Sequence, residues 1–200
     1  MSAIAGYVDA VGFLASGGFF VSFMSGNSTR LAVGISRGTA SAGIAAGLIS
    51  GFVTGVVLGS LCGTLAGAHR RSVVLVLVSA LLSGAAVCGM AGVQGVAIGL
   101  TALAMGAENA AFEQPGGSIG LTYMTGALAK VGQGIAGVLL GRSGFAWLSY
   151  LALWTGLVAG AILGAVEYPT FGIAALWLPA SLSLLVAIVT LTLGGRGSAP

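Results

Sequence analysis

Charged side chains are the scarcest feature of this sequence. Only 6% of the 200 residues are Asp, Glu, Lys or Arg, whereas 57% are hydrophobic, and the mean hydropathy is +1.09. A water-soluble domain carries about 25% charged residues, because its surface must be hydrated. So few charges cannot cover a water-facing surface, and we therefore expect the outer surface of this protein to face lipid.

Histidine and cysteine are also rare, which removes the usual signs of metal or redox chemistry. The single histidine, His69, lies beside two arginines in an expected loop, and Cys62 and Cys88 lie in apolar stretches without metal-ligand spacing. No nucleophile–base pair, metal cluster or cofactor loop is evident. The first residues lack the basic region and cleavage site of a signal peptide, so they are not expected to act as one. The net charge of +3 is too small to indicate nucleic-acid binding. We therefore expect no enzyme, no cofactor and no bound metal.

Long uncharged runs predict a helical membrane bundle. Ser72–Ala107 and Gly144–Val166 each lack any charged residue, and a helix needs about 20 apolar residues to cross a bilayer. Spanning segments must pair their backbone groups internally, and the alternating strands of a membrane barrel are missing. The sequence therefore predicts an all-α, polytopic transmembrane bundle. About six spans are expected, at residues 3–20, 40–67, 72–91, 93–112, 146–166 and 171–193.

The two halves of the chain resemble each other at an offset of 100 residues. Arg30 aligns with Lys130, and the Ser/Thr positions of a short motif agree in the same register, which apolar composition alone does not produce. We interpret the chain as one membrane domain, residues 1–200, with internal repeats at 1–92 and 93–200. The aligned segments are Gly6–Ala10 with Gly106–Ala110, and Ser22–Gly26 with Thr122–Gly126.

The distribution of Lys and Arg predicts the orientation of the spans, because cytoplasmic loops carry an excess of these residues. Six spans with Arg70 and Arg71 inside place both termini in the cytoplasm. Three spans per repeat is an odd number, so the two copies would be inserted in opposite directions, as in many transporters. We expect inverted repeats in a bacterial inner membrane, with broken or re-entrant motif segments. Lys130, Arg142 and Arg196 then lie inside, and Arg30 and Arg37 lie outside.

A ladder of glycines marks the second predicted span. Glycine recurs at every fourth position from Gly43 to Gly67, which makes a groove without side chains on one helix face. Gly156, Gly160 and Gly164 form a shorter series in the second half. Such grooves let helix backbones approach closely. The ladder predicts close packing within the bundle or in a homodimer, or else a smooth face along which helices slide during transport.

Ionisable side chains at membrane depth are costly, by about 2.5–3.5 kcal/mol, and tend to face a cavity or a partner. The groups in question are Asp9, Arg30, Glu108 and Lys130. Three interpretations remain open at this point. The acidic and basic residues form structural ion pairs, or they also line a translocation site, or the basic residues reach toward the membrane interface.

The repeated motif has a physical rationale as a broken helix. Within Ser25–Ser28, Gly26 is expected to break a helix, and Asn27 or a serine is expected to cap the restarted one. A helix N-terminus attracts anions, so two such helices facing each other would favour a small anionic or polar solute. The predicted binding residues are Asp9, Ser22, Ser25, Gly26, Asn27, Arg30, Glu108, Asn109, Thr122, Thr125, Gly126 and Lys130.

The same segments carry a resemblance to a known family. Gly6–Phe13, Phe20–Leu31, Ala104–Ala110 and Leu121–Gly126 are similar to the signature of the YoaK-like bacterial inner-membrane proteins. Members usually have a longer first helix and often carry Gln at the position of Glu108, which argues against a proton-relay role for this residue. The family is of unknown function, so the resemblance implies a membrane location but no substrate.

We expect a small-solute transporter or channel built from inverted repeats. The alternative is a non-transporting scaffold or dimerising component that packs through the glycine ladder. The expected partners are the lipid bilayer, a small ion or metabolite and, in the scaffold case, a second copy of the chain.

Overall fold

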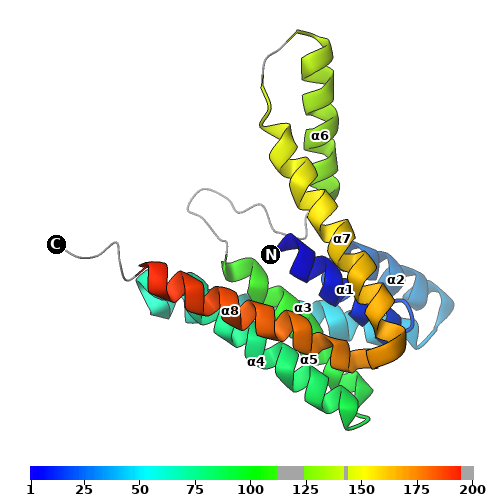
Figure 1. Ribbon diagram of the computed structural model, residues 1–200. Coiled ribbons are helices and arrows are strands. Elements are labelled where there is room, and N and C mark those ends of the chain that lie inside the picture. Colours follow the sequence, from blue (N-terminus) through cyan, green and yellow to red (C-terminus); the bar gives the residue numbers. More distant parts are fainter. Residues whose placement is uncertain (112–123, 142–143, 195–200) are drawn as a thin grey trace.

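The computed structural model describes residues 1–111, 124–141 and 144–194, and within these ranges every regular element is helical (Figure 1). This confirms the predicted all-α class. The α-helices are α1 (Ser2–Ala15), α2 (Met24–Arg37), α3 (Ser41–Ala66), α4 (Arg70–Met90), α5 (Gln94–Ala111), α6 (Met124–Leu139), α7 (Trp147–Phe171) and α8 (Trp177–Gly194). Two short 3₁₀ helices, η1 (Gly67–His69) and η2 (Gly172–Leu176), separate α3 from α4 and α7 from α8.

Helices α1, α3, α4, α5, α7 and α8 occupy the six predicted spans. Two continuous helical runs, Ser41–Met90 and Trp147–Leu193, are long and apolar enough to cross a membrane. Each is too long for a single span and is divided by a glycine in the left-handed region, at φ 53° for Gly67 and 56° for Gly172. Because a glycine adopts this conformation without steric strain, the chain turns there and begins another helix.

The first span ends earlier than predicted. Helix α1 stops at Ala15, since Gly17 and Gly18 adopt positive φ angles of 71° and 106° and turn the chain away. The predicted span at 171–193 also begins late, because residues 172–176 form η2 before α8 starts.

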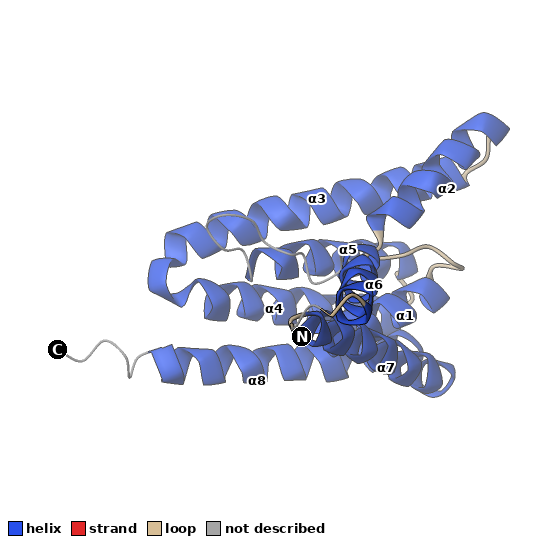
Figure 2. Ribbon diagram, turned by 90° about the horizontal axis from the view of Figure 1, so that it is seen from above, coloured by secondary structure: helices blue, strands red, loops and turns tan. Residues whose placement is uncertain are grey.

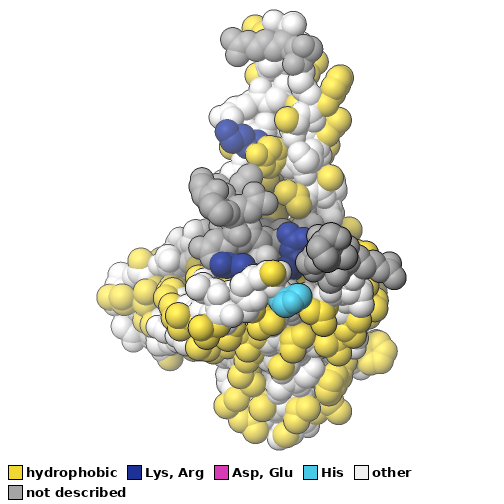
Figure 3. All heavy atoms as spheres, turned by 90° about the vertical axis from the view of Figure 1, so that its left-hand side faces the viewer, with side chains coloured by type: hydrophobic (Ala, Val, Ile, Leu, Met, Phe, Trp, Pro, Cys, Tyr) yellow, Lys and Arg dark blue, Asp and Glu magenta, His cyan; other side chains and the backbone are white. Residues whose placement is uncertain are grey.

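Large apolar side chains cover much of the outer surface. Leu65 is 88% exposed and Leu139 is 82% exposed, and many exposed Val, Leu and Ile residues lie on α3, α4, α7 and α8. Figure 3 shows these hydrophobic atoms spread over the body of the bundle, with Lys and Arg confined to a few places. Apolar surface of this extent is found where a protein meets lipid or another protein.

Two helix pairs approach at backbone distance: α1 with α7, and α3 with α5. A Cβ added to Gly160 would lie 1.8 Å from the carbonyl oxygen of Ala3, and one added to Gly55 would lie 2.0 Å from that of Leu103. The middle of the glycine ladder is therefore packed inside the chain. Its first members, Gly43 and Gly47, face open space.

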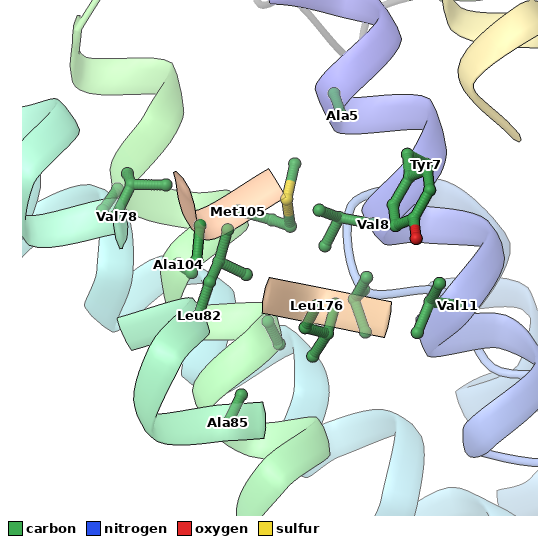
Figure 4. Packing of buried hydrophobic residues seen from close by; sticks show 14 of the residues in the cluster. Ala5, Tyr7, Val8, Val11, Val78, Leu82, Ala85, Ala104, Met105 and Leu176 are labelled. Carbon is green, nitrogen blue, oxygen red and sulfur yellow. The ribbon is translucent and has the colours of Figure 1, made fainter. Parts of the chain in front are cut away.

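The hydrophobic core lies where α1, α4, α5 and η2 meet. Figure 4 shows Val8 of α1, Leu82 of α4, Met105 of α5 and Leu176 of η2 directed toward one another, and all four side chains are buried. Figure 2 shows α4 and α8 extending alongside each other in the bundle. By contrast, α6 and the first part of α7 project from the remaining helices (Figure 1).

Candidate functional site

Asp9 organises the loop that joins α1 to α2. Its Oδ1 atom accepts hydrogen bonds from the backbone N–H groups of Val21 (3.0 Å) and Ser22 (2.8 Å). Hydrogen bonds to an ionised acceptor are stronger than neutral ones, and here they satisfy two backbone donors that have no helical partner. Of the three interpretations left open above, a structural ion pair between Asp9 and Arg30 is not formed, because the Asp9 carboxylate accepts from the loop backbone instead.

Asn27 holds the same loop from the side of α2. Its Oδ1 accepts from the backbone N–H of Phe20 at 3.1 Å, and its Nδ2 donates to the Phe20 carbonyl at 2.6 Å. The side chain is fully buried. The predicted capping role is therefore wrong, since α2 starts at Met24 without a side-chain cap.

Gly26 does not break a helix. It lies within α2 at a negative φ, and a Cβ there would lie 2.6 Å from the Phe23 ring. Gly126 likewise lies inside α6 without a positive φ. The break comes earlier, at Gly17 and Gly18, and Gly26 instead makes room for the aromatic ring at the start of α2.

Arg30 stacks on an aromatic ring of the loop. Its guanidinium lies 5.1 Å from the ring centroid of Phe19, a cation–π arrangement worth about 0.5–1 kcal/mol at an exposed site. Arg30, which lies within α2, thus contacts the same loop that Asp9 and Asn27 hold.

The second half is arranged differently. Glu108 is buried and its Oε1 has no hydrogen-bond partner, whereas Lys130 is exposed. The structural ion pair of these two residues, which was the second half of the same open interpretation, is therefore not formed either. Asn109 is half-buried and donates to the carbonyl of Met105. Thr122 lies outside the described residues.

The starts of the two motif helices line one cavity of about 430 Å³. Three predicted residues meet there: Ser22, Ser25 and Thr125. Two methionines and two aromatic residues complete the wall, namely Met24, Met124, Phe23 and Phe52. Among the described residues, the lining offers hydroxyl donors and acceptors beside apolar rings and thioethers but no charged side chain, so it suits a small polar solute with an apolar face.

Residues 1–189 match a family model described as a protein of unknown function, DUF1275. The chain belongs to the DUF1275 family. It is also 42% identical over 187 residues to the UPF0700 transmembrane protein RA0705 of Rhizobium meliloti (strain 1021), covering 93% of this chain and 81% of that protein. No solved structure matches. The family match and the composition together identify a transmembrane helical protein, and neither assigns it an activity.

Sequence reasoning missed several features of this DUF1275 protein. Met24 and Met124, which line the cavity, were not predicted, although the methionine is identical in both copies of the motif. Phe52 of α3 also lines the cavity, and no motif in the sequence around it indicates this. The hydroxyl of Tyr7, on α1, donates to the carboxylate of Glu167 on α7 at 2.5 Å and lies 3.1 Å from the carbonyl of Ala175. An acidic residue just after a long uncharged run could have drawn attention to this contact.

Proposed function

We propose that this protein is a small-solute transporter or channel built from two inverted repeats, with the cavity between the motif helices as its solute site. The observation that carries the proposal is that one cavity is lined by the first residues of both α2 and α6. Binding sites at the interface between repeats are typical of inverted-repeat transporters.

The order of elements supports the repeat. A helix, a motif helix, a long helix, a 3₁₀ turn and a closing helix occur in α1 to α4 and again in α5 to α8. The backbone contacts are exchanged between the halves, as a two-fold axis requires. Three glycines of one half each contact the backbone of the other half, and each contact has a counterpart in which the halves are exchanged. The contact of Gly55 with Leu103 corresponds to that of Gly160 with Ala3. In the same way, Gly59 with Ala107 corresponds to Gly164 with Tyr7, and Gly106 with Phe52 corresponds to Gly6 with Leu157.

The pairing of the two closing helices supports inversion. Ser72 near the start of α4 bonds Thr190 near the end of α8, and Gly89 near the end of α4 contacts Ile173, just before α8. The helices are therefore antiparallel. A two-fold axis that exchanges antiparallel helices is perpendicular to them, so in a bilayer it lies in the membrane plane.

The lining favours a polar solute without net charge over an anion. Ser22, Ser25 and Thr125 supply hydroxyl groups, whereas Arg30 and Lys130 are not among the lining residues. The backbone N–H groups of Gly26 and Asn27 at the start of α2 already bond the carbonyl of Phe23, so few donors remain there for an anion. A bacterial inner-membrane location, cytoplasmic termini and membership among the YoaK-like proteins belong to the same proposal.

The scaffold alternative has less support, because Gly55 and Gly59 already contact α5 of the same chain. The beginning of the ladder, at Gly43 and Gly47, has nothing within 4 Å and is open to a second copy. A dimer through this short stretch is compatible with transport and does not replace it.

Uptake by purified protein in sealed liposomes tests the proposal, with a panel of small polar metabolites and ions. Ser25→Trp and Thr125→Trp should each fill the cavity and abolish uptake of whichever solute enters. Thr192→Trp is the matched control, because Thr192 is exposed on α8 away from the cavity. Uptake that is unchanged in both cavity variants, or an absence of uptake across the panel, would argue for the scaffold.

A further inference from the structure

A second polar cavity, of about 260 Å³, lies between α2 and the start of α3. Arg30 and Arg37 are seven residues apart on α2, and this spacing brings them to the same helix face. The helices are in close contact there, since a Cβ on Gly34 would lie 2.6 Å from the backbone nitrogen of Ala42. The lining residues are Thr29, Arg30, Val33, Gly34, Arg37, Thr39 and Ser41.

The chemistry of this lining matches a phosphate group. Each guanidinium presents paired N–H donors that fit two phosphate oxygens, and the hydroxyls of Thr39 and Ser41 add two neutral donors. Within the part of the chain that the structure describes, no carboxylate lines the cavity to compete for the arginines. The nearest acidic side chain in sequence, Asp9, is already committed to the loop backbone.

We propose that this cavity binds a phosphate group, carried by an anionic phospholipid headgroup or free in solution. The site is separate from the proposed solute cavity and shares none of its lining residues. It is nevertheless connected to it, because Arg30 also stacks on Phe19, and Phe19 belongs to the loop that carries Ser22. A phosphate on Arg30 and Arg37 therefore holds that loop in place from the membrane surface.

Two binding measurements test the proposal and distinguish the two sources. Native mass spectrometry of the full chain from nanodiscs counts retained phosphatidylglycerol against phosphatidylcholine, and calorimetry in neutral detergent titrates inorganic phosphate. Arg37→Gln is the principal variant, because Arg37 is exposed at the end of α2 and its loss should leave the fold intact. Arg30→Gln is the second variant, and Lys130→Gln is the charge-matched control on the motif helix of the other half.

Each arginine variant should weaken binding about fivefold, the factor that corresponds to about 1 kcal/mol for one basic residue near an anionic membrane surface. Lys130→Gln should bind as the wild type does. Selective retention of phosphatidylglycerol without phosphate binding identifies the headgroup as the source, and saturable binding of inorganic phosphate identifies free phosphate. Equal retention of both lipids together with no phosphate binding overturns the proposal, as does an equal loss in Lys130→Gln and Arg37→Gln.

Discussion

Replacing Gly55 by alanine tests whether α3 and α5 meet at backbone distance. The added methyl carbon would lie 2.0 Å from the carbonyl oxygen of Leu103 and 2.8 Å from its carbon, where a Cβ contact shorter than 3.0 Å is essentially never seen. Both are main-chain atoms that cannot rotate aside, so the helices must separate by about 1 Å. Overpacking of this kind costs about 1–3 kcal/mol. At about 2 kcal/mol the melting temperature should fall by about 4–8 °C for a chain of this size.

Thermal unfolding in one detergent measures this effect, with two matched comparisons. Gly47→Ala lies on the same helix with nothing within 4 Å of the added carbon, so it should leave the melting temperature unchanged or raise it, since alanine favours helix. Gly160→Ala, at the corresponding place in the second half, should lower it as Gly55→Ala does. The losses should add in the double variant, because the two contacts lie on different helix pairs. If Gly55→Ala and Gly47→Ala have the same melting temperature, the contact between α3 and α5 is not formed. The proposed two-fold relation between the halves would then lose one of the contacts that support it.

Two further substitutions test polar contacts. Asp9→Ala should cost about 1–3 kcal/mol for each N–H that loses its acceptor, at Val21 and Ser22, and should speed thiol labelling of a cysteine placed at Ser22. Asp9→Asn keeps one acceptor oxygen and should lose less, so equal losses in the two variants would contradict the assignment. Tyr7→Phe should cost about 1.5–3 kcal/mol, because it removes a hydrogen bond to the charged Glu167. This loss should shrink to about 0.5–1.5 kcal/mol, the contribution of a neutral hydrogen bond, when Glu167 is already glutamine, because the amide keeps one acceptor oxygen. Thermal unfolding of the single and double variants measures the difference.

The spans were predictable because a bilayer imposes a similar length and apolarity on every helix that crosses it. The span predicted at 40–67 corresponds to helix Ser41–Ala66, and the span predicted at 72–91 corresponds to helix Arg70–Met90. The end of α1 was not predictable in this way. Apolar residues continue beyond Ala15, so hydropathy does not register the turn, whereas the backbone conformations of Gly17 and Gly18 produce it.

The residues of the candidate site were easier to predict than their partners. Asp9 and Asn27 stood out as polar groups at membrane depth, and opposite charges suggested ion pairs. The structure gives them backbone partners in the loop at residues 16–23 instead. The backbone N–H groups of that loop lack helical partners only because a helix ends there, and no sequence pattern predicts this. Phe52 was missed for a related reason, since it reaches the cavity only through the packing of α3.

The two halves agree in their backbone contacts but differ in their polar ones, and this difference can be tested against the transport that we propose. The counterpart of Tyr7 is Ala107, just as the counterpart of Ala3 is Leu103, and the counterpart of Glu167 is Cys62, just as the counterpart of Gly160 is Gly55. Ala107 and Cys62 cannot form the equivalent hydrogen bond. If the proposed transport exchanges the conformations of the two halves, the α1–α7 pair takes the arrangement that the α3–α5 pair has here. Both pairs have the same close backbone contacts, at Gly164 with Tyr7 and at Gly59 with Ala107, so Tyr7 and Glu167 should stay together in both states. The bond then stabilises both states alike. Tyr7→Phe should therefore lower the melting temperature and leave unchanged the side from which a cysteine at Ser25 is labelled. A change in the side of labelling would mean that the α1–α7 contact differs between the two states.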